Sequence, residues 1–187
     1  MSVEELKRIM EPPRNPVGIN DDASWIAIER DVGVSLPADY KDLVLQYGVG
    51  CIGGFLWVLN PFTKNTNLNL AFQVQVKLDA MKQLRDEFGT KVPSLFPEEM
   101  GLFPWAFTDN GDVLYLRFQN GTLPPPVVIG DSGGIDWAEF DGTVSDSLAA
   151  LLTRRFVVSF FPDDFPSDAP TFVPTDGIGG GGSFPEK

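Results

Sequence analysis

The chain of 187 residues contains no histidine. Histidine is the side chain that most often acts as a general base near neutral pH, activates serine or cysteine nucleophiles and binds transition metals. We therefore expect no catalytic residues, no metal and no cofactor. An enzyme that works with carboxylates alone stays open as a remote alternative, because 26 acidic residues always include some pair that a fold could bring together.

Cysteine is almost absent as well, since Cys51 is the single one. One cysteine can form neither an internal disulfide nor a structural zinc site, so we expect it to be buried and inert. A single thiol fits a reducing compartment. No apolar run reaches the ~18 residues of a membrane helix, and the N-terminal residues MSVEELKRIM lack the apolar centre of a secretory signal. These features predict a soluble, cytoplasmic protein that does not bind a membrane.

Basic residues are also scarce: 14 Lys and Arg stand against 26 Asp and Glu, for a net charge of −12. Such a surface repels phosphate backbones, so we expect no nucleic-acid binding, and nothing indicates a small-molecule substrate. The acidity either only keeps the protein in solution or steers it toward a basic partner, which raises the association rate more than the affinity. The segment from Trp105 to Asp146 holds seven acids and only one base, Arg117, so the charge is concentrated there.

One glycine pattern, Gly48-Val-Gly50-Cys-Ile-Gly53, matches the G-x-G-x-x-G loop of dinucleotide-binding folds. In those folds the loop follows a strand and opens a helix, whose N-terminus binds the pyrophosphate. Here the order is reversed, because residues 38–47 carry a helical apolar stripe and residues 55–59 form a continuous apolar run typical of a buried strand. We interpret the glycines as a helix end followed by a tight turn.

Hydrophobic periodicity predicts five helices, separated by strands and turns. The helices are expected over residues 3–10, from Asp21 or Asp22 to Val32, over 38–47, from Asn67 or Asn69 to Phe88, and from Thr143 to Arg155. The fourth carries the apolar stripe Val74, Leu78, Met81, Leu84 (or the stem of Arg85) and Phe88. Thr143 with Asp146 resembles a capping box, with Asp in place of the usual Glu or Gln, at the start of the fifth. Strands are expected over residues 55–59, 104–108, 113–118, 127–129 and 135–140, with hairpin turns at Asp109-Asn-Gly-Asp112 and at Asn120-Gly121.

This order predicts an α+β fold, an antiparallel sheet of about five or six strands with helices packed on it. We expect a lead segment at residues 1–20, a single domain at residues 21–155 and a tail at residues 156–187. The tail repeats proline every four residues at Pro162, Pro166, Pro170 and Pro174, which excludes a helix and predicts an extended segment. Its phenylalanines indicate that it is attached to the domain, and its terminal glycines are expected to be disordered.

One block of residues resembles the opening signature of the SUKH superfamily, which includes the fungal Smi/Knr cell-wall regulators and many bacterial toxin-immunity proteins. The block consists of Trp25, Ile28, Glu29, Gly33, Leu36, Pro37, Tyr40, Tyr47 and Gly48. Later features are similar too: a strand ending in Asn60-Pro61, Phe103-Pro-Trp-Ala-Phe before the hairpin, and a leucine-rich closing helix. The resemblance spans roughly residues 22–155 and implies an α+β fold with a binding role and no catalysis.

The resemblance implies an immunity protein that neutralises a basic toxin domain, often a nuclease or a deaminase. The alternative is a regulatory or scaffolding interaction domain of the Smi/Knr type. We expect the signature residues to serve core packing and helix ends, and for Glu29 both a polar contact with the sheet and a cap of a neighbouring turn stay open. The contact surface is expected on the acidic strands and loops, with Trp137 as an aromatic anchor among Asp109, Asp112, Asp131, Asp136, Glu139 and Asp141.

Overall fold

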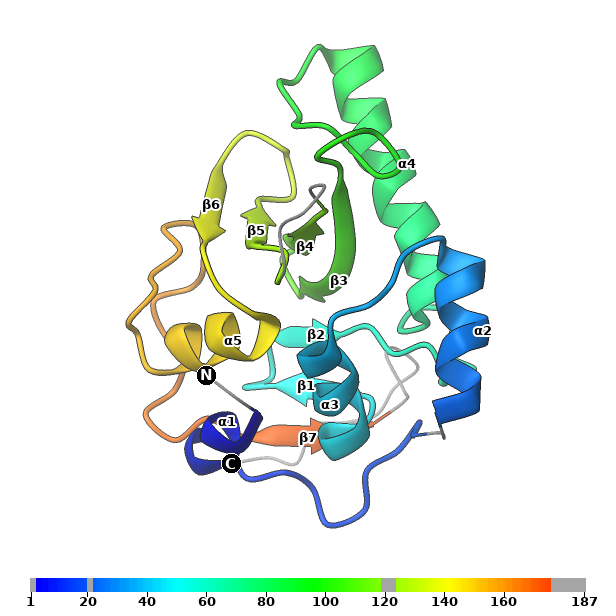
Figure 1. Ribbon diagram of the computed structural model, residues 1–187. Coiled ribbons are helices and arrows are strands. Elements are labelled where there is room, and N and C mark those ends of the chain that lie inside the picture. The colour runs from blue at the N-terminus through cyan, green and yellow to red at the C-terminus, as the bar shows by residue number, and fades with distance from the viewer. Residues whose placement is uncertain (1–2, 20–21, 119–123, 176–187) are drawn as a thin grey trace.

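The computed structural model describes residues 3–19, 22–118 and 124–175, which form five helices and a seven-stranded antiparallel sheet (Figure 1). The helices are α1 (Val3–Ile9), α2 (Asp22–Val32), α3 (Ala38–Tyr47), α4 (Leu70–Phe88) and α5 (Val144–Leu152). The strands are β1 (Gly50–Ile52), β2 (Leu56–Val58), β3 (Leu102–Thr108), β4 (Val113–Arg117), β5 (Val127–Gly130), β6 (Trp137–Phe140) and β7 (Phe172–Pro174). The expected α+β class is confirmed.

The strands lie in the order β6-β5-β4-β3-β2-β1-β7. Residues directly opposite in neighbouring strands share a face, so Trp57 and Phe107 lie on one face while Val58 and Ala106 lie on the other. Helices α1, α3 and α5 contact one another and pack in front of the β1–β2 end of the sheet (Figure 1). Helix α4 contacts β3. It reaches the face of the sheet that carries Trp57 and Phe107, because Lys77 Nζ lies 4.4 Å from the centroid of the Phe107 ring.

Local sequence features fix the ends of α4 and α5. The side chain of Asn69 accepts a hydrogen bond from the Phe72 N–H at the start of α4, and Gly89 ends the helix with φ of +67°. Asn69, and not Asn67, is therefore the cap. The capping box at Thr143 and Asp146 is confirmed. The expected position of Phe88 on the buried stripe is wrong: its side chain is 71% exposed, because the last turn of α4 extends beyond the core that buries Val74, Leu78 and Met81.

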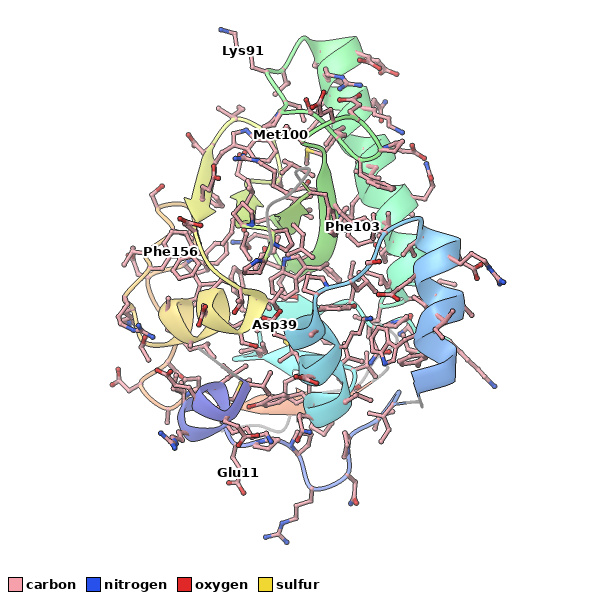
Figure 2. The ribbon with its side chains drawn as sticks, in the orientation of Figure 1. Glu11, Asp39, Lys91, Met100, Phe103 and Phe156 are labelled. Atoms are coloured by element: carbon pink, nitrogen blue, oxygen red, sulfur yellow. The ribbon has the colours of Figure 1, made fainter. Side chains whose placement is uncertain are left out.

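The tyrosines of the signature join the helices to the rest of the domain. The Tyr40 hydroxyl donates to the carbonyl of Leu59 over 2.6 Å, and the Tyr47 hydroxyl donates to the carbonyl of Met10 over 2.6 Å. The second bond fastens the N-terminal lead segment to α3. Between α3 and α5, the Asp39 carboxylate accepts from the Ser145 N–H over 2.8 Å, and Figure 2 shows Asp39 at this junction. Tyr40, Tyr47 and Ser145 are buried, so these contacts replace the hydrogen bonds that their polar groups would otherwise make with water.

The two alternatives for Glu29 are resolved in favour of a cap. Its Oε1 accepts a hydrogen bond of 2.7 Å from the Leu36 N–H and lies 2.6 Å from Lys41 Nζ. The side chain therefore closes the turn between α2 and α3, just before Pro37, which is the N-cap residue of α3. Because the carboxylate carries charge, these bonds are stronger than bonds between neutral groups.

The sheet has more strands than the five or six expected, because β1 and β7 are each three residues long and show no periodicity of their own. Strand β7 belongs to the tail and pairs with β1, with Cys51 opposite Val173. A Cβ at Gly50 would lie 2.3 Å from the Val173 carbonyl oxygen, so only glycine permits this approach. The expected turn at Asn120-Gly121 and the expected disorder of the terminal glycines lie outside the described residues.

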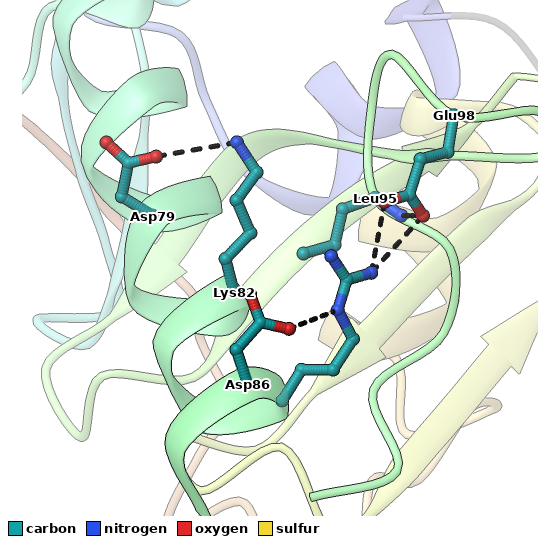
Figure 3. A network of polar contacts seen from close by, with 6 residues as sticks. Asp79, Lys82, Asp86, Leu95 and Glu98 are labelled. Atoms are coloured by element: carbon teal, nitrogen blue, oxygen red, sulfur yellow. Dashed lines mark hydrogen bonds and ion pairs between the residues drawn. The ribbon is translucent and has the colours of Figure 1, made fainter. Parts of the chain in front are cut away.

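The loop after α4 is held to the helix by an ion pair between Arg85 and Glu98, which is part of the network in Figure 3. Arg85 Nη1 lies 3.0 Å from Glu98 Oε1, and Glu98 Oε2 accepts from the Leu95 N–H over 3.0 Å. The Leu95 N–H and, after it, the Arg85 guanidinium lower the pKa of Glu98. The loop that leads into β3 is thereby fastened to the helix that precedes it.

The cap at Glu29 gives a stability prediction. Glu29→Ala leaves the Leu36 N–H without its acceptor, so we expect the free energy of unfolding to fall by about 1–3 kcal/mol in a denaturant titration. Glu29→Gln keeps an oxygen acceptor and should lose less. The control is Arg30→Ala, an exposed position on the same helix, where we expect a change of less than about 0.5 kcal/mol. Equal stability of Glu29→Ala and Arg30→Ala would show that the cap is not used.

Candidate functional site

The expected contact residues begin at the β3–β4 hairpin, where two of them have structural partners. Asp109 Oδ1 accepts a hydrogen bond of 2.6 Å from the indole Nε1 of Trp57. Asp112 is only 3% exposed, and its Oδ2 accepts from the Thr108 hydroxyl over 2.8 Å. Its Oδ1 accepts from the Ser132 N–H over 3.2 Å. Asp112 is therefore withdrawn from the surface and holds two hairpins together.

Burial raises the pKa of the Asp112 carboxyl, and the hydrogen bonds from Thr108 and Ser132 offset part of that rise. The nearby charge of Asp131 raises the pKa further. Burying a carboxylate costs desolvation free energy, which its two hydrogen bonds offset in part. We interpret these bonds as the contacts that position the two hairpins.

Asp131 organises the loop between β5 and β6. Its Oδ1 accepts from the N–H groups of Ile135, at 2.7 Å, and Asp136, at 3.0 Å. Its Oδ2 accepts from the Gly133 N–H over 3.3 Å. Three backbone donors on one carboxylate define the course of this loop, because each would otherwise need another acceptor. The loop therefore delivers the chain into β6 in a fixed register.

Trp137 folds back onto the sheet, so its side chain is half-buried. A Cβ at Gly130 would lie 2.5 Å from the Trp137 ring, which shows that the indole covers this glycine. The ring lies 6.0 Å from that of Tyr115, and its Nε1 donates to the Gly134 carbonyl over 3.1 Å. The sequence predicted that Trp137 is an aromatic anchor on a contact surface. In the structure its indole packs on the β5–β6 hairpin, and the part that stays exposed is what a partner could contact.

The other three expected contact residues, Asp136, Glu139 and Asp141, are exposed and lie along β6 or at its ends. Glu139 forms an ion pair with Arg117, whose Nη1 lies 2.7 Å from each carboxylate oxygen. Strand β6 is the outermost strand of the sheet (Figure 1). We call Asp136, Trp137, Glu139 and Asp141 the acidic edge. The structure brings these four residues together on β6 and at its two ends. Asp131 lies directly beside the start of this edge, because its Oδ1 accepts from the Asp136 N–H.

Arg117 is the residue of this region that sequence reasoning left without a role. Its isolation among seven acids was a signal that it has an acidic partner. The partner could not be named, because Glu139 is brought beside Arg117 only by the pairing of β4 with β5 and of β5 with β6.

Cys51 lies in β1 opposite Trp57, is 1% exposed and belongs to a small cluster with Val49 and Leu68. Burial raises the pKa of its thiol to about 12, and the charge of Asp109 adds to this. The thiolate that a nucleophile requires is therefore scarce at neutral pH. The glycines around it have the expected helix end, at Gly48, and the expected turn, at Gly53, but Gly50 begins β1, a strand that was not expected.

The tail contributes to the fold through aromatic and backbone contacts. Phe165 stacks 4.8 Å from Phe55, and Arg154 Nη2 donates to the carbonyl of Pro166 over 2.7 Å. The acids Asp163, Asp164 and Asp168 are exposed. Within the described ranges no three His, Cys, Asp or Glu side chains are grouped so that they could hold a metal ion. None of the helices described there has the length and apolarity to cross a membrane.

Comparison with known proteins identifies the family. The model of the family described as SUKH_6, SMI1-KNR4 cell-wall, matches residues 22–152. Because this match covers well over half of the chain, the protein belongs to the SUKH superfamily. No curated protein and no solved structure gives a significant match. The match begins with α2 and ends with α5, so α1 and β7 lie outside it.

The buried carboxyl of Asp112 gives a prediction on pH. The pKa of Asp112 is higher in the folded state than in the unfolded state, so protonation of this carboxyl favours folding. Its contribution to the stability of the fold is therefore complete below the unfolded-state pKa and is lost as pH rises through the folded-state pKa. Asp112→Asn cannot titrate. We therefore expect its stability relative to the natural protein to increase from about pH 4 to about pH 7 in denaturant titrations.

Two results would contradict this role of Asp112. One is a stability difference between Asp112→Asn and the natural protein that is constant or that shrinks as pH rises. The other is full stability of Asp112→Ala, which lacks both acceptor oxygens and should lose about 1–3 kcal/mol because the Thr108 hydroxyl and the Ser132 N–H remain unpaired.

The buried thiol gives a second chemical prediction. We expect Cys51 to resist a thiol-specific reagent in the native protein at about pH 8 and to react fully once the protein is unfolded in denaturant, because attack requires an exposed thiolate. The measurement is the release of a coloured thiol from a disulfide reagent, followed against time. A free cysteine peptide serves as the control. Rapid reaction of the native protein would contradict the burial of Cys51.

Proposed function

We propose that this protein is a non-catalytic binding module that acts as an immunity protein, binding a basic toxin domain and blocking its active site. The observation that carries the proposal is the acidic edge, three exposed carboxylates on and at the ends of β6, an edge strand of the sheet. Membership of the SUKH superfamily supports a protein-binding role. The net charge of −12 supports a basic partner.

The division of labour among the acids strengthens this interpretation. The carboxylate oxygens of Asp112 and Asp131 accept hydrogen bonds from the backbone and side-chain donors that hold the hairpins. Asp136 and Asp141 are exposed next to them. A partner then meets carboxylates whose backbone is already ordered, which lowers the entropy lost on binding.

A toxin that acts on nucleic acid must itself carry a basic active-site region. An acidic protein that covers this region competes with the phosphate backbone for the same groups. This argument favours a nuclease or deaminase domain as the partner. The proposal includes a cytoplasmic location, which agrees with the single unpaired thiol of Cys51.

The test begins with the reading frames that flank the gene. The product of the adjacent frame, expressed alone in a bacterial host, should arrest growth, and coexpression of this protein should restore growth and yield a complex of the two. An adjacent product that is harmless, or whose toxicity is unaffected by this protein, would overturn the immunity proposal.

The description of the matching family favours a second candidate, a regulatory interaction domain of the Smi/Knr type. Such a domain would bind a partner without relieving toxicity. Coexpression distinguishes the two candidates, because only an immunity protein restores growth. Binding of a host protein through the acidic edge, in the absence of any protective effect, would favour regulation.

The acidic edge gives a kinetic prediction. Charge reversal at Asp136 and Asp141 should lower the association rate with the toxin domain roughly tenfold at low salt, because electrostatic steering acts on encounter. The difference should nearly vanish at ~0.5 M salt, where the Debye length is a few Å. Stopped-flow fluorescence measures both rates.

The matched control reverses the exposed acids Glu11 and Asp42, which changes the net charge by the same amount at positions away from β6. Figure 2 shows Glu11 at the lower end of the molecule, near α1 and away from β6. Equal slowing by the two double variants would mean that only the net charge matters, and it would move the contact surface away from the acidic edge.

A further inference from the structure

Strand β6 has one paired side and one open side. The Asp131 N–H donates to the Asp136 carbonyl, which fixes the hydrogen-bonded positions of the β5–β6 hairpin. Residues alternate in an antiparallel ladder, so Ala138 and Phe140 direct their backbone groups toward β5. Trp137 and Glu139 direct theirs outward. Among the described residues, no backbone hydrogen bond engages these outward groups.

The opposite edge of the sheet differs in chemistry. The Gly53 N–H donates to the Thr171 carbonyl, and the Thr175 N–H donates to the Val49 carbonyl. By the same alternation, the backbone groups of Phe172 and Pro174 point outward, away from β1. Proline has no N–H, and proline on an edge strand blocks further pairing. Strand β6 contains no proline, so it keeps both outward donors.

We propose that β6 accepts an extended, basic segment of the protein partner as an added antiparallel or parallel strand. This inference rests on the proposed function and specifies how the partner is held. Main-chain hydrogen bonds to Trp137 and Glu139 would supply affinity, and side chains of the added strand would supply selectivity. The open edge and its acidic side chains both favour this occupant.

A second copy of this chain is a poor occupant of the same edge. Pairing β6 with β6 would place Asp136, Glu139 and Asp141 of one copy beside the same three acids of the other. Like charges directly opposite in a sheet are destabilising, and charged edges prevent self-association in natural sheets. The same charges stabilise a strand that carries lysine or arginine.

The geometry also specifies the pattern of the added strand. Trp137 and Glu139 share one face of the sheet, and Ala138 and Phe140 share the other. The Glu139 side chain is 49% exposed although it pairs with Arg117, so its oxygens can accept a further donor. Phe140 contacts Phe156 at a ring distance of 5.3 Å, which forms an apolar surface on its face. A strand that alternates basic and apolar residues therefore matches both faces.

Two variants at one position separate backbone pairing from charge. Glu139→Gln removes the carboxylate charge and keeps the N–H. Glu139→Pro removes both, and its ring is tolerated because this N–H faces solvent. Both variants lose the ion pair with Arg117, so they are matched. We expect Glu139→Pro to bind a strand-forming basic probe roughly tenfold more weakly than Glu139→Gln, since a backbone donor is lost and the ring obstructs pairing.

The probe is an end-capped synthetic peptide of alternating lysine and valine, about eight residues long, enough to span β6. A peptide of alternating glutamate and valine is its control. With the natural full-length protein, we expect the lysine peptide to slow hydrogen exchange at the Trp137 and Glu139 amides, as measured by NMR. The glutamate peptide should not. This measurement needs no substitution, so it holds even if Glu139→Pro fails to fold.

Three outcomes would overturn strand addition: no protection of these amides by the lysine peptide, protection only at other sites, or equal binding by Glu139→Pro and Glu139→Gln. These failures are distinguishable from failure of the proposed function. A toxin domain whose association still depends on Asp136 and Asp141, and which binds both Glu139 variants equally, would preserve the immunity role and reject the added strand.

Discussion

The buried carboxylate of Asp112 is the contact on which the candidate site depends. One of its oxygens accepts from Thr108 within the β3–β4 hairpin, and the other accepts from Ser132 in the loop that leads to β6. The β3–β4 and β5–β6 hairpins are connected in the sheet by the pairing of β4 with β5. The side chain of Asp112 adds a second connection between them. The position of β6 follows from this link and from the three backbone donors of Asp131.

The acidic character of the chain therefore has two physical origins. Some carboxylates accept hydrogen bonds that order the turns: Asp112 is buried, Asp131 is half-buried, and Asp109 is exposed but accepts from the Trp57 indole. Others, Asp136 and Asp141, are exposed beside them. The same residue type supplies rigidity and surface potential, and the surface charges act from a backbone that the structural carboxylates have already fixed.

Sequence was sufficient wherever structure depends on near neighbours. The capping box at Thr143, the helix end at Gly89 and the turn after Asp109 all involve groups within a few residues, and all were predicted. Contacts between distant segments were not. Strand β7 and the ion pair of Arg117 with Glu139 depend on register and on chain reversal, which local periodicity does not encode. For Glu29 the sequence left a cap and a contact with the sheet as alternatives, and only the fold decided between them. The seven acids could be named from sequence, but the fold was needed to show which of them accept structural hydrogen bonds, as Asp112 and Asp131 do, and which are exposed beside β6.

The pairing of β1 with β7 has a consequence for synthesis of the chain. Residues Gly50–Ile52 leave the ribosome long before their partner Phe172–Pro174, because β7 belongs to the tail. Until the tail is made, the outer edge of β1, which contains Cys51, has no partner strand, and such an edge promotes association between incomplete chains. Pairing of β7 with β1 is then the step that covers this edge and ends the tendency of the incomplete chain to associate with other chains.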